Sequence, residues 1–124
     1  MFNTFFSIRI VIFTKMINSV YNIIAVMSGT SLDGIDVIYV TFKIDGRWSF
    51  KIHHTETLPY NKIWKKRLKN LIDLSSQELN QTDKDYTKYL SEKINEFISK
   101  YHIKDIDFIS SHGHTALHQP DQFL

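Results

Sequence analysis

The residue types best suited to chemistry gather in one short polar stretch that separates two apolar segments. The stretch comprises Ser28, Gly29, Thr30, Ser31, Leu32, Asp33, Gly34, Ile35 and Asp36. Glycines permit positive φ and close backbone approach, while exposed N–H groups and short hydroxyls suit phosphate oxygens. A carboxylate at Asp33 or Asp36 could hold Mg²⁺, directly or through water. The composition therefore predicts a phosphate-binding turn. The alternative is an ordinary turn that binds nothing, since turns favour the same residue types.

A second polar stretch follows an apolar segment near the other end of the sequence. It comprises His112, Gly113, His114 and Thr115, with His118 shortly beyond. Three histidines are a frequent zinc-ligand set, but no further donor follows until Asp121, and Gly113 indicates a turn. We therefore interpret these residues as the polar lining of a sugar or nucleotide pocket, with a zinc site as the alternative.

Hydrophobic periodicity predicts the elements that must position the two stretches. Apolar or alternating runs predict four strands, at residues 21–27, 36–43, 48–56 and 106–111. Their β-branched and aromatic residues favour the pleated sheet, and Asp45-Gly46 is the strongest turn signal in the chain. The first three strands are therefore expected to be antiparallel neighbours.

Between the third and fourth strands, apolar spacing of three and four predicts helices. Asn61 is placed to cap the first, whose periodic residues are Ile63, Trp64, Arg67, Leu68, Leu71 and Ile72. Ser75 or Ser76 opens the next helical segment, with Glu78 placed for a capping box. From Asp83 onward a long helix carries a stripe that indicates core packing, formed by Tyr86, Leu90, Ile94, Phe97 and Tyr101.

The resulting order, β-β-β-α-α-β, predicts how the two polar stretches meet. A helical crossover returns the chain to a strand that is parallel with one already in the sheet. If the last strand lies parallel beside the first, both strands end at the same edge, where open α/β sheets bind their ligands. Gly29-Thr30 and His112-Gly113 are then expected to face each other across that edge.

The literal strings resemble those of a known family. Residues 27–36, Met-Ser-Gly-Thr-Ser-Leu-Asp-Gly-Ile-Asp, resemble the N-terminal signature of the anhydro-N-acetylmuramic acid kinases. Residues 111–115, Ser-His-Gly-His-Thr, and then His118-Gln119-Pro120 resemble the family's Ser-His-Gly-Gln-Thr and His-x-Pro, with His114 where glutamine is familiar. The implied fold is the ribonuclease-H-like half-domain of the actin, hexokinase and Hsp70 ATPase superfamily. Residues 16–124 would form the incomplete N-terminal part of its first lobe.

The resemblance also implies an activity and its cofactors. These sugar kinases use ATP and Mg²⁺ to convert 1,6-anhydro-N-acetylmuramic acid and water to N-acetylmuramic acid 6-phosphate, in recycling of the bacterial cell wall. Residues 29–36 correspond to the segment that binds the ATP phosphates. Gly29, Thr30 and Ser31 would donate to the β- and γ-phosphates, and Asp33, ahead of Asp36, would be the Mg²⁺-linked carboxylate.

The family's catalytic base belongs to an Asp-Thr-Gly-Pro-Gly-Asn segment that does not occur in these 124 residues. We therefore expect no catalytic residue of the family in this chain, which resembles roughly the first third of a full member. We interpret it as a fragment that does not turn over the anhydro-sugar alone, because closure of two lobes completes such sites. A non-catalytic binding or assembly module, or a gene remnant, is the alternative.

Length and composition limit the class of protein. With 43% hydrophobic and 23% charged residues, the chain is typical of a globular protein of at most one domain. A net charge of +2 is too small to argue for a nucleic-acid partner, and none is expected. The absence of cysteine excludes disulfides and thiol catalysis and is compatible with a reducing cytoplasm. One solvated helix face is predicted by the clustered basic residues Lys62, Lys65, Lys66, Arg67 and Lys69.

Residues 1–15 form an apolar segment interrupted by Arg9. It is too short to span a membrane, and no small-residue cleavage site follows it. We interpret it as an extension outside the fold, with an added strand or a membrane-touching anchor as the alternative. The family resemblance implies a small anhydro-amino sugar as the partner, in the cytoplasm, and we expect no nucleic-acid or membrane partner. A homodimer of the full-length protein is left open.

Overall fold

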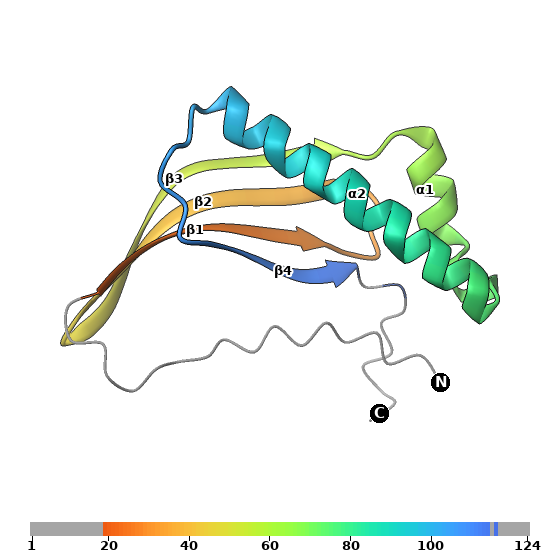
Figure 1. Cartoon of the computed structure of the whole chain (residues 1–124), viewed down its shortest axis with the longest axis horizontal. Helices are drawn as coiled ribbons and strands as arrows, with labels where there is room; N and C mark the ends of the chain where they lie inside the picture. The colour runs from red at the N-terminus through yellow and green to blue at the C-terminus, as the bar shows by residue number, and fades with distance from the viewer. Residues whose placement is uncertain (1–18, 115, 117–124) are drawn as a thin grey trace.

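The computed structural model describes residues 19–114 and 116, which form a four-stranded sheet with two helices (Figure 1). The predictions for residues 1–15, Thr115 and residues 117–124, which include His118 and Asp121, therefore lie outside the described residues. The predicted element order is confirmed. The elements are β1 (Ser19–Ser28), β2 (Gly34–Asp45), β3 (Arg47–Pro59), α1 (Lys62–Lys69), the 3₁₀ turn η1 (Leu71–Asp73), α2 (Ser76–Lys100) and β4 (Phe108–His114).

The sheet has the strand order β3-β2-β1-β4. β1 is antiparallel to β2 and β2 to β3, whereas β1 and β4 are parallel, with Ile23 opposite Phe108. The predicted parallel pairing of the first and last strands is therefore confirmed. The register shifts between Val26 and Ser28, beyond which Ser28 pairs with His114. The carboxyl ends of both strands thus lie at one edge of the sheet.

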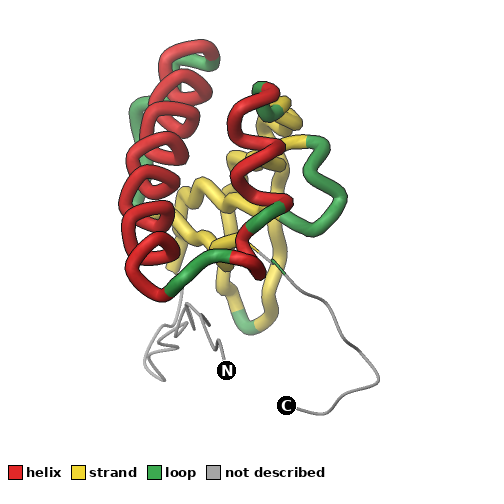
Figure 2. The backbone as a smooth tube through the Cα atoms, turned by 90° about the vertical axis from the view of Figure 1, so that its right-hand side faces the viewer, coloured by secondary structure: helices red, strands yellow, loops and turns green. Residues whose placement is uncertain are grey.

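The hydrophobic core lies between one face of the sheet and the two helices. Alternate side chains of β1 and β2 point to this face, because successive residues of a strand face opposite sides. Phe97, Ile24, Ile35 and Val37 have less than 2% of their surface exposed. Figure 2 shows the two helices, in red, next to each other. Their core contribution is the buried set Trp64, Leu68, Tyr86, Ile94 and Phe97.

The opposite face of the sheet carries large apolar side chains that solvent reaches. The paired positions Ile23–Phe108 and Val40–Ile52 share this face, since paired residues on neighbouring strands point the same way. Phe108 and Ile52 are 48% and 49% exposed, and Trp48 is 60% exposed. The two described helices therefore cover only one side of the sheet.

Helix α1 is shorter than its apolar spacing predicts. It ends at Lys69, and Leu71 and Ile72 belong to η1 instead. Trp64 and Leu68, four residues apart, are buried, while Ile63 and Ile72 are more than 60% exposed. Eight residues offer only one short stripe toward the core, so Ile63, about 100° around the helix from Trp64, faces outward. The prediction of a helical stripe through Ile72 is wrong.

The local start signals of both helices are confirmed. The Asn61 side chain accepts a hydrogen bond from the Trp64 backbone N–H at 2.9 Å. Ser75 and Glu78 form the reciprocal capping box that opens α2. α2 then runs without interruption to Lys100. None of the helices in the described part of the chain is long and apolar enough to cross a membrane.

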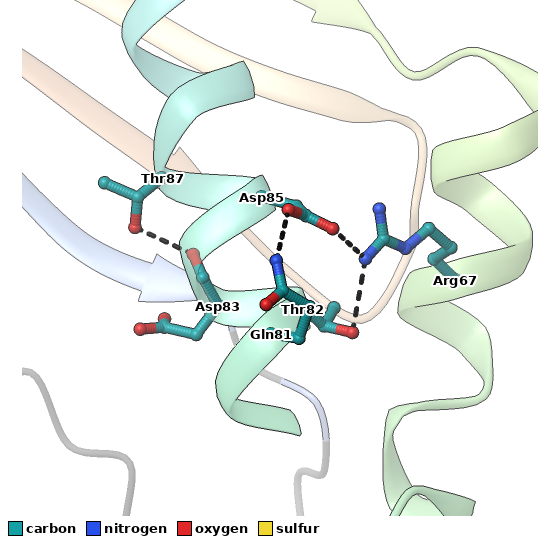
Figure 3. A network of polar contacts seen from close by, with 6 residues as sticks. All are labelled: Arg67, Gln81, Thr82, Asp83, Asp85 and Thr87. Carbon is teal, nitrogen blue, oxygen red and sulfur yellow. Dashed lines mark hydrogen bonds and ion pairs between the residues drawn. The ribbon is translucent and has the colours of Figure 1, made fainter. Parts of the chain in front are cut away.

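The basic residues around Arg67 predict that it belongs to a solvated basic face. In the structure it does not. Its guanidinium donates to the Asp85 carboxylate at 2.7 Å and to the Thr82 hydroxyl at 3.3 Å, both on α2 (Figure 3). It also lies over the Trp64 ring, 4.5 Å from the centroid. Arg67 therefore links α1 to α2, and the prediction that it is solvated with the lysines is corrected.

Candidate functional site

The polar stretch predicted to bind phosphate forms the connection between β1 and β2, at the edge where β1 and β4 end. The turn is closed by a hydrogen bond from the Leu32 N–H to the Gly29 carbonyl, 3.3 Å long. Leu32 and Ile35 anchor the segment, because Leu32 packs against the core and Ile35 is fully buried. These two residues can offer a ligand only their backbone.

The two glycines of the loop differ from their predicted role. Neither has a positive φ, and it is Leu32 that adopts the left-handed conformation, with φ of 56°. A Cβ at Gly34 would lie 2.5 Å from the Leu58 carbonyl oxygen, so this glycine permits close packing of β3. A Cβ at Gly29 would meet no atom of the described residues within 4 Å. The prediction of positive φ at these glycines is therefore wrong, and the described part of the fold places no steric demand on Gly29.

The exposed loop side chains are free to meet a ligand. Thr30, Ser31 and Asp33 are exposed. Within residues 19–114 and 116, their side chains make no hydrogen bond or ion pair. Asp36 differs, since its carboxylate accepts a hydrogen bond from the Thr57 hydroxyl on β3. Asp33 is thus the uncommitted carboxylate of the loop.

The second polar stretch continues β4 instead of forming a turn after it. The strand extends through His112 and Gly113 to His114, three residues beyond its predicted end. Gly113 takes a positive φ of 73° and its N–H bonds to the Ser111 hydroxyl at 3.1 Å. A left-handed glycine lets the strand pass the irregularity in its pairing with β1. Among the described residues no three potential metal ligands come together.

The two stretches meet through Ser28 and His114. The Ser28 hydroxyl lies 2.7 Å from His114 Nδ1. Ser28, expected to be an adaptable ligand donor, is 3% exposed and its hydroxyl is already committed. The expected convergence of the two strand exits is therefore present, but Ser28 belongs to its buried side.

Two tyrosines that the sequence reasoning did not assign to a site extend this contact. The Tyr60 hydroxyl bonds to the Ser28 hydroxyl, and the Tyr86 hydroxyl lies 2.7 Å from that of Tyr60. Tyr86 does pack in the core, as its place in the helical stripe predicts. A tyrosine at a core position is itself a signal, since a buried phenol needs a hydrogen-bond partner.

Burial keeps the Tyr60 phenol and the His114 imidazole neutral. It raises the pKa of the Tyr60 phenol; the hydrogen bond with Ser28 lowers this pKa, and the contact with Tyr86 raises it. Burial also lowers the pKa of His114, and nearby His112 lowers it further. At neutral pH Tyr60 is therefore a phenol and His114 an uncharged imidazole.

Comparison with known proteins identifies the family. The sequence model described as anhydro-N-acetylmuramic acid kinase matches residues 21–124. The chain belongs to the anhydro-N-acetylmuramic acid kinase family. A relative of that name from Rhizobium etli is 30% identical over 112 residues, which cover 82% of this chain and 30% of the relative. Relatives of the same name from Shewanella baltica and Mannheimia succiniciproducens are each 32% identical over 103 residues, which cover 79% of this chain and 27% of each relative.

Family membership agrees with the fold. The mixed α/β architecture, with its four strands and two helices, is that of an ATPase-like N-terminal half-domain of these kinases. The chain spans about 30% of the length of the curated relatives that it matches. The matched part includes both polar stretches, which the parallel pairing of β1 and β4 brings to one edge.

Proposed function

We propose that residues 29–36 are the ATP-phosphate-binding segment of an anhydro-N-acetylmuramic acid kinase. The observation that carries the proposal is the parallel pairing of β1 and β4 in a chain of this kinase family. It puts the Gly29–Asp33 connection and His112 at the carboxyl ends of neighbouring parallel strands, where open α/β sheets bind ligands. His112, Gly113 and His114, with Thr115 beyond them, are proposed to line the substrate side.

The proposed reaction transfers the γ-phosphoryl group of ATP to the sixth-position oxygen of 1,6-anhydro-N-acetylmuramic acid while water opens the anhydro ring. The products are ADP and N-acetylmuramic acid 6-phosphate, an intermediate of peptidoglycan recycling. Phosphoryl transfer depends on positioning and on spreading negative charge. In this chain, the exposed Thr30 and Ser31 hydroxyls would donate to phosphate oxygens, and Gly29 leaves space beside the backbone.

The donor set fits Mg²⁺ held largely by phosphate and water. Mg²⁺ is commonly bound through one or two carboxylates together with substrate phosphates, and the loop offers Asp33 as an uncommitted carboxylate. Asp36 ranks second because Thr57 already donates to it. When bound, the ion would neutralise phosphate charge.

Binding of MgATP to the 124-residue chain tests the phosphate-site proposal directly. We expect the changes in backbone amide chemical shift on addition of MgATP, measured by NMR, to concentrate in residues 29–36. We expect Asp33→Asn to weaken binding, while Asp83→Asn on the exposed side of α2 serves as the charge-matched control. Shifts that are absent from the loop, or equal losses in both variants, would contradict the proposal and favour a non-catalytic module. A coupled ADP-release assay should show no sugar-dependent turnover by this chain alone.

Kinetics in a chimera test the role of each residue. The chimera joins this chain to the C-terminal portion of a family member. Losing a charge-stabilising contact in the transition state costs on the order of 3 kcal/mol, about a hundredfold in rate, so Asp33→Asn should lower kcat/KM by about that factor. His114→Gln should have a far smaller effect, because an amide can replace the imidazole donor. A zinc site predicts the reverse order, with His114 critical and Asp33 dispensable.

A further inference from the structure

Four polar side chains from four segments form one continuous hydrogen-bonded chain beside the β1–β2 loop. Tyr86 lies on α2, Tyr60 directly follows β3, Ser28 ends β1, and His114 ends β4. The Tyr86 and Tyr60 oxygens are 2.7 Å apart, the Tyr60 and Ser28 hydroxyls are in direct contact, and Ser28 Oγ is 2.7 Å from His114 Nδ1. Tyr86, Tyr60 and Ser28 are 8%, 4% and 3% exposed. Water therefore has little access to the first three members.

The number of available protons determines in which direction the hydrogen bonds of this series are donated. Each hydroxyl carries one proton, and a neutral imidazole carries one proton on either Nδ1 or Nε2. If Tyr86 donates to Tyr60, Tyr60 to Ser28 and Ser28 to Nδ1, all three hydroxyl protons are used. In the reverse direction, Nδ1–H donates to Ser28 and the last proton, on Tyr86, has no acceptor among the described residues. Leaving a buried donor unpaired is costly, so the first direction is favoured.

We propose that the Tyr86–Tyr60–Ser28 chain holds His114 in the neutral tautomer protonated at Nε2, so that His114 offers an N–H donor to a ligand oxygen at the β1–β4 edge. Tyr60 and Tyr86 are then positioning residues that act through Ser28. Nε2 has no partner among residues 19–114 and 116. The recognised chemistry is an oxygen acceptor, from either a phosphate or a sugar. Only this ligand assignment rests on the proposed function; the tautomer does not.

The electrostatic surroundings support this protonation state. Burial lowers the pKa of His114 and disfavours the imidazolium, which would place a proton on both ring nitrogens. Burial also keeps the Tyr60 phenol protonated, so that it remains a donor. A phenol is a more acidic donor than an alkyl hydroxyl, and an imidazole nitrogen is a good acceptor, so the favoured direction runs from the phenols to the ring.

The tautomer can be read directly from the full 124-residue chain without ligand. Two-bond ¹H–¹⁵N NMR spectra of ¹⁵N-histidine-labelled protein at neutral pH distinguish a protonated from an unprotonated Nδ1. We expect His114 Nδ1 to resonate as an unprotonated nitrogen. Tyr60→Phe removes the donor to Ser28 and should shift this resonance toward the average of a tautomer mixture. Tyr89→Phe removes a phenol of the same aromatic cluster that is not part of the hydrogen-bonded series. This substitution should leave the His114 Nδ1 resonance unchanged.

The outcomes separate this inference from the phosphate site. A wild-type Nδ1–H tautomer, or equal shifts in the folded Tyr60→Phe and Tyr89→Phe proteins, would overturn it. If Tyr60→Phe does not fold, Ser28→Ala provides the same test. We expect this variant to lose the preference for an unprotonated Nδ1. An unchanged Nδ1 resonance would overturn the inference. The protein is titrated with MgATP and, separately, with the anhydro-sugar. We expect one of these two compounds to perturb the Nε2 resonance of His114. If neither compound perturbs the Nε2 resonance, the proposed role of Nε2–H in binding a ligand is overturned. The conclusion about the tautomer is then unaffected.

Discussion

The glycines at the two ends of the β1–β2 loop lead to opposite expectations. Gly34→Ala would put a Cβ 2.5 Å from the Leu58 carbonyl oxygen, and overpacking of this kind costs about 1–3 kcal/mol. Gly29→Ala meets open space, so its free energy of unfolding should change by less than about 0.5 kcal/mol. Urea denaturation measures both. MgATP binding should weaken in Gly29→Ala, because the added methyl group occupies the proposed ligand side of the loop.

A destabilised Gly29→Ala protein would show that the loop has a structural need for glycine there. Unchanged MgATP affinity in a stable Gly29→Ala protein would instead contradict close approach of the phosphates at this position. Gly34→Ala serves as the folding control, since its cost arises from β3 and not from a ligand.

Single-residue chemistry could be predicted from the sequence only in part. Residue types located the loop and Asp33, but not the positive φ of Leu32, which depends on how its side chain reaches the core. A tyrosine at a core position signals a buried hydrogen bond, but the partners of Tyr60 and Tyr86 depend on contacts across the fold, so no local pattern identifies them. The tautomer proposed for His114 also gives a reason for histidine where the resemblance implies glutamine, because both side chains then offer one acceptor and one donor.

Arg67 is the residue through which the two helices can be uncoupled. Arg67→Met should lower the urea midpoint of unfolding, because it removes the donor to Asp85 and Thr82. Lys66→Met, on the same helix but exposed, is the matched control and should have little effect. An equal change in both variants would mean that Arg67 contributes only its charge.

The same link predicts a pH dependence with a defined sign. Hydrogen bonding from Arg67, with Gln81 adding to it, lowers the pKa of Asp85 from its ordinary value of 3.8. Stability from a depressed carboxyl pKa is fully present above the unfolded value and is lost as pH falls through the folded value. The difference in unfolding midpoint between wild type and Arg67→Met should therefore be constant above about pH 5 and narrow in acid. A difference that widens in acid would contradict the ion pair.

At the scale of elements, the structural features that local sequence signals specify were predicted best. The caps at Asn61 and Ser75 involve residues three positions apart, so the sequence alone contains both partners. The end of α1 was not predicted, because Ile72 continues the apolar spacing while the chain turns into η1 to reach α2. Arg67 was misassigned for a related reason: its partners lie on another helix.

In the described part of the molecule, helices cover one face of the sheet and leave the other open, and the two tryptophans report on these faces separately. Trp64 is 7% exposed in the core, while Trp48 is 60% exposed on the open face. Trp64→Phe should leave red-shifted emission that iodide quenches, and Trp48→Phe should leave shielded emission at shorter wavelength. Shielded Trp48 emission would show that something covers the open face in solution.

The arrangement of the strands was predictable because the chain offers few alternatives. Three strands joined by short connections form a meander, and a helical crossover permits a parallel fourth strand. The extent of β4 was not predictable, because its last residues pair with β1 only beyond an irregularity at Ser28. The convergence of the site was thus foreseen, but its hydrogen bonds were not.

The position of β4 also bears on the order in which the molecule assembles. Ser28 and His114 are 86 positions apart in the chain, whereas β1, β2 and β3 are consecutive neighbours that can pair early. Distant pairings bear a larger loop-closure entropy and form slowly. The β1–β2 loop would therefore exist before His114 reaches it, and the edge that holds both would be the last part of the sheet to close. A ligand bound across that edge would then slow hydrogen exchange in β4 more than in the β2–β3 hairpin.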